Sequence, residues 1–385
     1  MLGTYFLYLS ILTFSTAFVW LYEKADCPII ARLMLFIAFL IVFLPAALRY
    51  NIGTDYWSYV DMFQEIKNGY PSQEEIAWLW LNVFIAKTGL DVQWIFVISS
   101  FITYLFIFKA YPKDGAWILH FVFICSFYLI SYSTVRGGVA FAIMFFAIVQ
   151  YIQTRRLFRF YIFLLLALLF HKSSILYIIV PILISRKIFW SFEKRWFVYG
   201  IYTALALFFL FRLSLAIWLL DNPISDYLGY ASYASDPVFS KPGQLGTAVG
   251  IMLHVAVLMI PLLFRKQFID AGGISQALVP LNIITIFSIA AALGAIIFGR
   301  VERLFDFCYF LTPYCALISL KGWPKRLSVL FVIFAWGALF AKNIEHDQST
   351  RCGGMRISPY VSILNKQDDH SVSVSAFTCM TQEGI

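Results

Sequence analysis

Charged residues are scarce in this chain, and their scarcity is the first clue to its class. Only 13% of the 385 residues are Asp, Glu, Lys or Arg, whereas 61% are hydrophobic. Soluble domains are typically about 25% charged and about 45–50% apolar, so the composition excludes an ordinary soluble protein. Apolar stretches of about 20 residues recur along the chain, which indicates membrane-spanning helices rather than a barrel.

The motifs that would hold a nucleotide or a metal ion are also missing from the sequence. None of the six Cys has metal-ligand spacing. The sequence has no P-loop, no HExxH motif and no paired-aspartate motif in a soluble loop. We therefore expect neither a metal nor a cofactor. The net charge of +8 lies mostly in short loops, where it sets membrane topology, so nucleic acid is not an expected partner.

The apolar segments predict an all-α polytopic bundle of about 10–12 transmembrane segments. Residues 1–341 form the expected membrane domain, with outer loops at about 50–75 and 221–245. Residues 342–385 are expected to form a polar external C-terminal tail that is partly disordered. The predicted spans are 2–22, 29–48, 92–110, 116–134, 138–153, 160–185, 196–220, 246–264, 277–298, 304–320 and 326–341.

The segment 160–185 differs from the others because a polar run, 171–174, interrupts it. The loops on either side, 155–159 and 186–195, are both basic, so both are expected on the cytoplasmic side. A segment that crossed the membrane once would place one of them outside. We therefore predict a broken or re-entrant helix pair that turns at the polar run and returns. One long kinked helix is the alternative.

Cations at the ends or in the middle of apolar segments are the first candidate site residues. A charge at the bilayer centre costs roughly 2.5–3.5 kcal/mol on insertion scales, so Lys172 beside His171 predicts a functional site. Arg136 precedes two glycines at a predicted helix start, which suits phosphate binding. Arg300 and Arg303 share one helical face. Interfacial anchoring and ion pairing are the alternative explanation for these arginines.

The first outer loop is the second candidate, because residues 49–59 gather an Arg, an Asp and four aromatic residues. Gly53 permits a tight backbone turn there. Aromatic rings beside a carboxylate commonly hold sugars, which makes Arg49, Asp55 and Tyr56 candidate saccharide contacts. An interfacial aromatic belt capped by a turn is the alternative.

These landmarks, in this order, resemble the EpsG family of bacterial exopolysaccharide and O-antigen polymerases of the Wzy type. The resemblance covers about residues 30–365 and departs from the family pattern at Gly137, where Gln is more usual. The matching stretches are Arg49 to Tyr56, Arg136 with Gly138-Val139-Ala140, and Phe170-His171-Lys172-Ser173; Arg303 and Pro359-Tyr360 match more weakly.

The resemblance implies a metal-independent glycosyltransferase of the bacterial inner membrane. In the implied reaction, a hydroxyl of one lipid-linked oligosaccharide repeat attacks the anomeric carbon of the growing chain and displaces undecaprenyl diphosphate on the periplasmic face. The candidate catalytic residues are His171 as general base, Asp55 as the rival base, and Arg136 on the leaving diphosphate. The expected substrate-binding residues are Arg49, Gly53, Tyr56, Lys172, Ser173, Arg300 and Arg303.

The implied partners are undecaprenyl-diphosphate-linked oligosaccharide and membrane lipid, with a chain-length regulator and a flippase as further candidates. Two alternatives stay open. A transporter or flippase of lipid-linked saccharides would use the same cations without chemistry and show broken helices in corresponding halves. The sequence has one convincing break, which disfavours it. A membrane O-acyltransferase that uses His171 is the other, and acetyl content rather than polymer length would identify it.

Overall fold

The computed structural model describes residues 2–70, 74–185, 194, 198–205, 207, 209–211, 248–294, 299–349 and 355–365. These residues form helices joined by turns, and among them there is no β-strand, only an isolated bridge between Arg49 and Ser362. The prediction of an all-α bundle is confirmed. The predicted loop 221–245, most of the segment 196–220 and the tail from 366 lie outside the described residues.

The chain divides into two compact units. The first comprises Met1–Ala142 and Trp336–Ile385, and the second comprises Ile143–Ala335. Both boundaries fall inside a helix, one in α7 (Val135–Thr154) and one in α19 (Gly322–Ser349). Helix α19 continues past residue 341, where the membrane domain was predicted to end.

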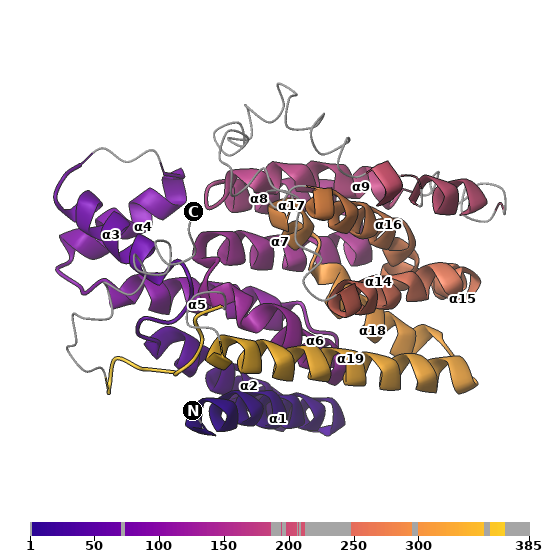
Figure 1. The fold of residues 1–385 in the computed structure, drawn as a ribbon, viewed down its shortest axis with the longest axis horizontal. Coiled ribbons are helices and arrows are strands. Elements are labelled where there is room, and N and C mark those ends of the chain that lie inside the picture. The colour runs from indigo at the N-terminus through magenta and orange to yellow at the C-terminus, as the bar shows by residue number, and fades with distance from the viewer. Residues whose placement is uncertain are drawn as a thin grey trace. The chain divides into compact units, whose positions relative to one another are not determined.

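In the first unit, α1 and α2 run side by side, α2 packs on α5, and α1 packs on α6 (Figure 1). Pro28 stands at the start of α2, where its fixed φ favours a helix and its missing N–H costs nothing. The elements are α1 (Leu2–Lys24), α2 (Pro28–Leu48), α3 (Tyr56–Lys67), α4 (Ile76–Lys87), α5 (Gln93–Lys109), α6 (Ala116–Phe123), the π-helical turn η1 (Ile124–Tyr128) and the 3₁₀ turn η2 (Ile130–Tyr132).

In the second unit, α14, α16 and α18 pack against one another. Asn282 of α16 joins the three helices, because its Nδ2 donates to the Leu258 carbonyl at 2.9 Å and to Thr312 Oγ1 at 2.8 Å. The elements are α8 (Leu157–Leu168), the 3₁₀ helix η3 (Lys172–Ile179), α9 (Val180–Leu183), α14 (Ala248–Leu263), α15 (Arg265–Ala271), α16 (Gly273–Gly294), α17 (Gly299–Leu304) and α18 (Phe307–Ser319).

The segment 160–185 turns and returns, as predicted. The Arg155 guanidinium donates through Nη1 to the carbonyl of Ile184 at 3.1 Å, so the two ends of the segment meet. A continuous helix over these 30 residues would separate its ends by roughly 40 Å at 1.5 Å per residue. Helix α8 has 12 residues and is too short to cross a bilayer core of about 30 Å by itself.

Five described helices are long and apolar enough to cross a membrane, or up to six if a bent pair counts as one span. The bent pair consists of 249–263 and 265–271, which meet at 65°. The predicted span 246–264 thus continues into a second helix. The bend lies at Phe264, whose φ of −105° and ψ of 31° depart from helical values. Other predicted spans appear as apolar helices of 10–17 residues, so the predicted number includes helices that cannot cross alone.

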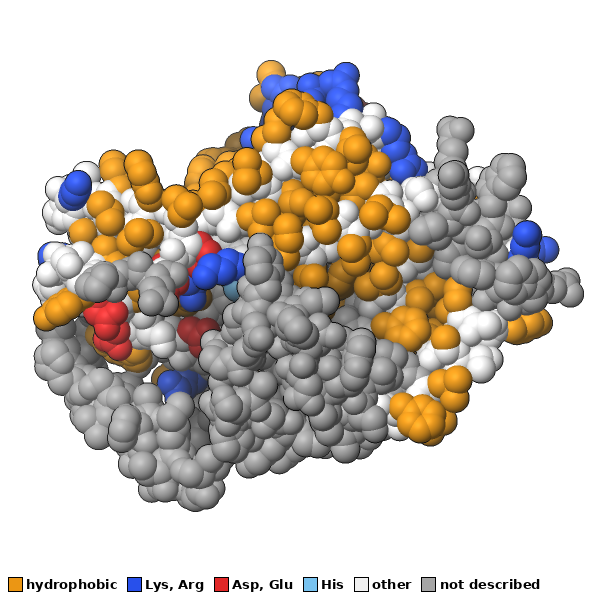
Figure 2. Space-filling model, turned by 90° about the horizontal axis from the view of Figure 1, so that it is seen from above, with side chains coloured by type: hydrophobic (Ala, Val, Ile, Leu, Met, Phe, Trp, Pro, Cys, Tyr) orange, Lys and Arg blue, Asp and Glu red, His pale blue; other side chains and the backbone are white. Residues whose placement is uncertain are grey.

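Much of the described surface is hydrophobic (Figure 2). Large side chains such as Phe6 and Phe158 are 77% and 78% exposed. Exposed apolar surface on this scale is unfavourable in water and fits contact with lipid chains. Together with the long apolar helices, it makes this chain a multi-pass membrane protein.

Candidate functional site

Arg49, a predicted substrate contact, has a side chain that is only 1% exposed. Its Nη1 donates to the carbonyl of Ala46 and, at 3.2 Å, to Ser100 Oγ. Its guanidinium also lies 4.8 Å from the ring centroid of Phe96 and 5.0 Å from that of Tyr132. These hydrogen bonds and cation–π contacts hold the charge inside the first unit. Arg49 therefore fixes the start of the outer loop from within.

Gly53 is the residue that allows the outer loop to pack closely on the turn before α7. Its φ is +101°, and a Cβ at this position would lie 2.5 Å from the Tyr132 carbonyl oxygen. The next residue continues the contact, because the backbone N–H of Thr54 donates to Ser133 Oγ at 3.0 Å. Only glycine combines this φ with so close an approach.

The two remaining candidates of the loop differ in exposure. Asp55 is exposed at the start of α3 and accepts a hydrogen bond from Thr54 Oγ1 at 2.9 Å. Tyr56 is 2% exposed and stacks on Phe96, with ring centroids 4.6 Å apart. Burial raises the pKa of Tyr56, which therefore stays protonated at neutral pH. Asp55 faces solvent, whereas Tyr56 belongs to the core beneath it.

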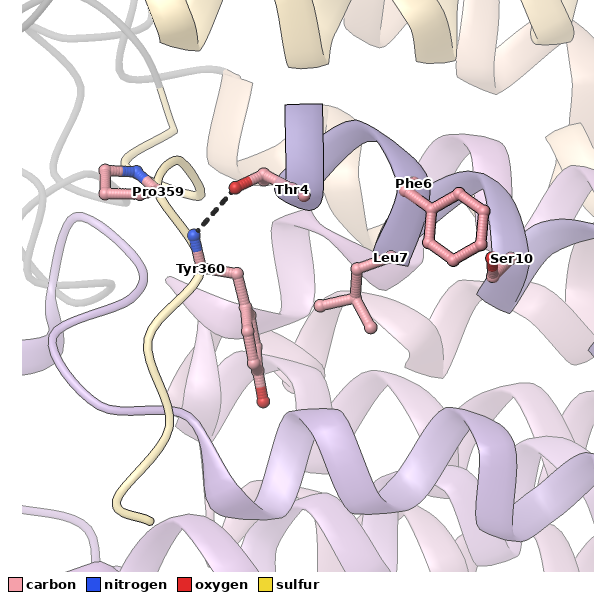
Figure 3. A pocket seen from close by; sticks show the side chains of 7 residues that line it. Thr4, Phe6, Leu7, Ser10, Pro359 and Tyr360 are labelled. Carbon is pink, nitrogen blue, oxygen red and sulfur yellow. Dashed lines mark hydrogen bonds between the residues drawn. The ribbon is translucent and has the colours of Figure 1, made fainter. Parts of the chain in front are cut away.

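The described part of the C-terminal tail, 355–365, packs on the same loop and on α1. The backbone N–H of Tyr360 donates to Thr4 Oγ1 at 3.0 Å (Figure 3). The Tyr360 hydroxyl donates to the carbonyl of Pro45 at 2.8 Å. The backbone N–H of Gly53 donates to the carbonyl of Arg356 at 2.9 Å. This segment therefore supports the outer loop.

Arg136 lies in the first turn of α7 and pairs with two carboxylates that the sequence did not single out. Its Nη1 contacts Glu74 Oε2 and lies 2.8 Å from Glu75 Oε2. The side chains of Arg136, Glu74 and Glu75 are 25%, 24% and 10% exposed. The hydroxyl of Tyr59 interacts with Arg136 through a hydrogen bond. We call these four residues, Arg136, Glu74, Glu75 and Tyr59, the Arg136 cluster.

An aromatic core lies beneath this cluster. Tyr59 meets Trp78 edge to face with ring centroids 5.3 Å apart, and both residues belong to a buried group with Phe63 and Phe96. Burial raises the pKa of Tyr59, so its hydroxyl stays protonated at neutral pH. The cluster is thus a partly exposed polar group on a rigid apolar base.

In the second unit, the turn of the hairpin carries three further candidates. His171 precedes η3 in extended conformation and is partly buried, Lys172 is exposed, and Ser173 is 5% exposed. The backbone N–H of His171 donates to the carbonyl of Ala167 at 2.9 Å. This bond caps the C-terminal end of α8 and fixes the position of the His171 backbone at the turn.

The short helix α17, with Arg300 and Arg303, packs against this turn. The hydroxyl of Tyr177 in η3 donates to the carbonyl of Leu304 at 2.6 Å, and both residues are buried. Arg300 and Arg303 are both exposed, as is Lys172. The second unit therefore brings two elements with exposed cations into contact.

Acidic residues accompany the cations of α17. Glu302 accepts a hydrogen bond from the Tyr309 hydroxyl at 3.3 Å, and Asp306 is 7% exposed. Burial raises the pKa of Glu302, whereas the hydrogen bond from Tyr309 and the charge of Arg303 lower it. The charge of Arg303 is thus close enough to Glu302 to act on the protonation of its carboxyl group.

Sequence reasoning missed Glu74, Glu75, Tyr59 and Tyr177. The only signal for the first two was the acidic excess of the outer loop, which was interpreted as a marker of topology. Among the described residues, no group of three or more His, Cys, Asp or Glu side chains could hold a metal ion.

Comparison with known proteins gives one result. A model of the EpsG family matches residues 32–362, which is most of the chain. Searches of curated proteins and of solved structures found no match. The family match supports a role of the polysaccharide-polymerase type on a lipid-linked saccharide. It also agrees with the order of motifs from Arg49 to Tyr360, and the chain belongs to the EpsG family.

Proposed function

We propose that this protein polymerises undecaprenyl-diphosphate-linked oligosaccharide repeats on the periplasmic face of the bacterial inner membrane. The product is an O-antigen, a capsular polysaccharide or an exopolysaccharide. One observation carries the proposal beyond family membership: the hairpin turn with His171 and Lys172 packs on the helix with Arg300 and Arg303. A basic imidazole and several cations in neighbouring elements match the needs of a transfer that expels a diphosphate.

The reaction forms one glycosidic bond and breaks one. The acceptor hydroxyl oxygen attacks the anomeric carbon while the bond from that carbon to the diphosphate oxygen breaks. The leaving diphosphate keeps the bonding electron pair, and a general base removes the hydroxyl proton. No oxidant or reductant takes part.

Lys172, Arg300 and Arg303 are the proposed contacts of the leaving diphosphate. Negative charge grows on the bridging oxygen as the bond breaks, so fixed cations there stabilise the transition state more than the ground state. Arginine holds phosphate oxygens through two parallel hydrogen bonds, whereas lysine acts as a point charge. The Tyr177–Leu304 bond holds the elements that carry these cations together.

His171 is the proposed general base, because a neutral imidazole accepts a proton near neutral pH. Its backbone is fixed at the turn by the hydrogen bond to Ala167. Ser173 is a proposed polar contact of the substrate next to it. Asp55 is the rival base, since it is an exposed carboxylate in the outer loop. Arg49, Gly53 and Tyr56 support that loop from the inside, and their proposed contribution to substrate binding is the shape of the loop.

Transport of lipid-linked saccharides is the second candidate, because the structure contains a second interrupted helix. The bend between 249–263 and 265–271 adds to the break at 169–171, so the number of breaks no longer argues against a transporter. Family membership favours polymerisation. A flippase and a chain-length regulator are proposed as separate partners of this chain.

Deletion of the gene tests the proposal in cells. Surface polysaccharide from the deletion strain should run on a gel as a single-repeat band, and the wild-type gene should restore the ladder. Loss of the single-repeat band together with the ladder would instead indicate a defect in transport. An unchanged ladder that lacks acetyl groups would indicate an acyltransferase.

A further inference from the structure

The Arg136 cluster has the wrong charge for a diphosphate. One guanidinium is paired with the carboxylates of Glu74 and Glu75, so the three side chains together carry a net charge of −1. Asp55 lies close enough to Tyr59 for its charge to act on that hydroxyl, which makes the surroundings more negative. A diphosphate would have to approach this charge and displace at least one carboxylate from Arg136.

The same groups are well suited to the hydroxyls of an uncharged sugar. Each carboxylate accepts hydrogen bonds from hydroxyl groups, while the guanidinium and the protonated Tyr59 hydroxyl donate them. The side chains are held in place before a ligand arrives, because Glu75 Oε2 lies 2.8 Å from Arg136 Nη1 and the cluster rests on a packed aromatic core. Fixed polar groups lose little conformational entropy on binding.

The cluster is also accessible enough to meet a ligand. About a quarter of the Arg136 and Glu74 side chains is exposed, and Glu75 is 10% exposed. An ion pair that only stabilised the fold would gain little from such a position, because partly solvated pairs contribute weakly. Trp57, partly buried on α3, adds an aromatic surface in the same loop, where its ring lies 5.5 Å from that of Tyr56.

We propose that the Arg136 cluster binds saccharide hydroxyls of the acceptor repeat and does not bind the leaving diphosphate. Glu75 and Glu74 are then specificity-determining residues, and Arg136 holds them in position. This inference rests on the proposed polymerase function and assigns one of its two substrates to the first unit. It replaces the sequence-based expectation that Arg136 contacts the diphosphate.

The test measures two ligands separately on the full-length protein in lipid nanodiscs. The first probe is the lipid-free oligosaccharide repeat, released by mild acid from the lipid-linked pool of the host. The second probe is undecaprenyl diphosphate. Glu75→Gln and Arg136→Gln should each weaken binding of the oligosaccharide at least tenfold and leave the affinity for undecaprenyl diphosphate within twofold of wild type. Glu65→Gln, an exposed acid on α3, is the matched control and should change neither.

The opposite pattern overturns the inference. In that pattern, Arg136→Gln loses its affinity for undecaprenyl diphosphate, or Glu75→Gln binds this lipid more tightly because Arg136 is released. Oligosaccharide binding that survives both substitutions overturns it too. Should Glu75→Gln fail to fold, Glu74→Gln gives the same comparison at a more exposed position. A wild-type protein that binds neither probe contradicts the proposed function itself, which separates that failure from failure of the inference.

Discussion

Substitution of Gly53 by alanine tests whether the close approach of the outer loop to the turn before α7 is needed for activity. The added Cβ would lie 2.5 Å from the carbonyl oxygen of Tyr132 and 2.8 Å from its carbonyl carbon. Both neighbours are backbone atoms, so no side-chain rotation relieves the overlap. The loop must move away, and the 3.0 Å bond from Thr54 N to Ser133 Oγ is lost with the movement.

The expected loss of stability in Gly53→Ala has two contributions, the backbone strain at this position and the lost hydrogen bond. A non-glycine residue at φ +101° costs about 1–3 kcal/mol of backbone strain. The lost hydrogen bond adds about 0.5–1.5 kcal/mol. If the displaced loop relieves this strain, Asp55 and Tyr59 move from their positions. A shift of about 1 Å at a binding group costs on the order of 100-fold in rate.

The assay compares Gly53→Ala with Gly69→Ala, because the second glycine has φ +81° and no atom within 4 Å of its would-be Cβ. Both variants carry backbone strain, and only the first carries the clash. We expect Gly53→Ala to lose the polysaccharide ladder at near-normal protein level, while Gly69→Ala retains it. Equal ladders from the two variants would refute the argument that close packing of this loop matters.

Three further predictions concern residues of the second unit, namely His171, Arg303 and Tyr177. His171→Gln keeps the polarity of the side chain but removes its basicity, so it should lower the polymerisation rate in purified vesicles by roughly 10²–10⁴-fold. A near wild-type rate would exclude His171 as the general base and leave Asp55 as the better candidate, which Asp55→Asn would then test. Arg303→Ala should abolish the ladder. Arg303→Lys should restore it only partly, because the point charge of lysine does not reproduce a bidentate contact. A full ladder from Arg303→Ala would remove this arginine from the mechanism. Tyr177→Phe should lower the thermal midpoint of the protein, because it leaves the Leu304 carbonyl without this donor at a cost of about 1–3 kcal/mol; an unchanged midpoint would show that the bond does not hold η3 on α17.

Much of the fold was predictable because hydropathy records where a helix can lie in a membrane. The segment 29–48 corresponds to α2 at Pro28–Leu48, and 138–153 lies within α7. The return of 160–185 was also predictable, since basic loops on both sides constrain the number of crossings. These inferences depend on composition and local order, which the sequence contains directly.

The details of the site depended on contacts between distant residues, which composition does not record. Glu75 and Arg136 are 61 positions apart, and their pairing follows from the packing of α4 near the start of α7. Sequence reasoning placed Arg49 among the saccharide contacts of the outer loop, yet aromatic rings and a backbone carbonyl enclose its guanidinium. The bend after Leu263 lies at Phe264, an apolar residue inside a predicted span, so hydropathy does not mark it.

The most direct test of the polymerase function is reconstitution of the purified full-length protein in lipid vesicles with the lipid-linked repeat as the only substrate. We predict a ladder of products, with one undecaprenyl diphosphate released for each glycosidic bond formed and no requirement for an added nucleotide. Movement of the lipid-linked repeat across the bilayer with no increase in length and no release of undecaprenyl diphosphate would contradict the account.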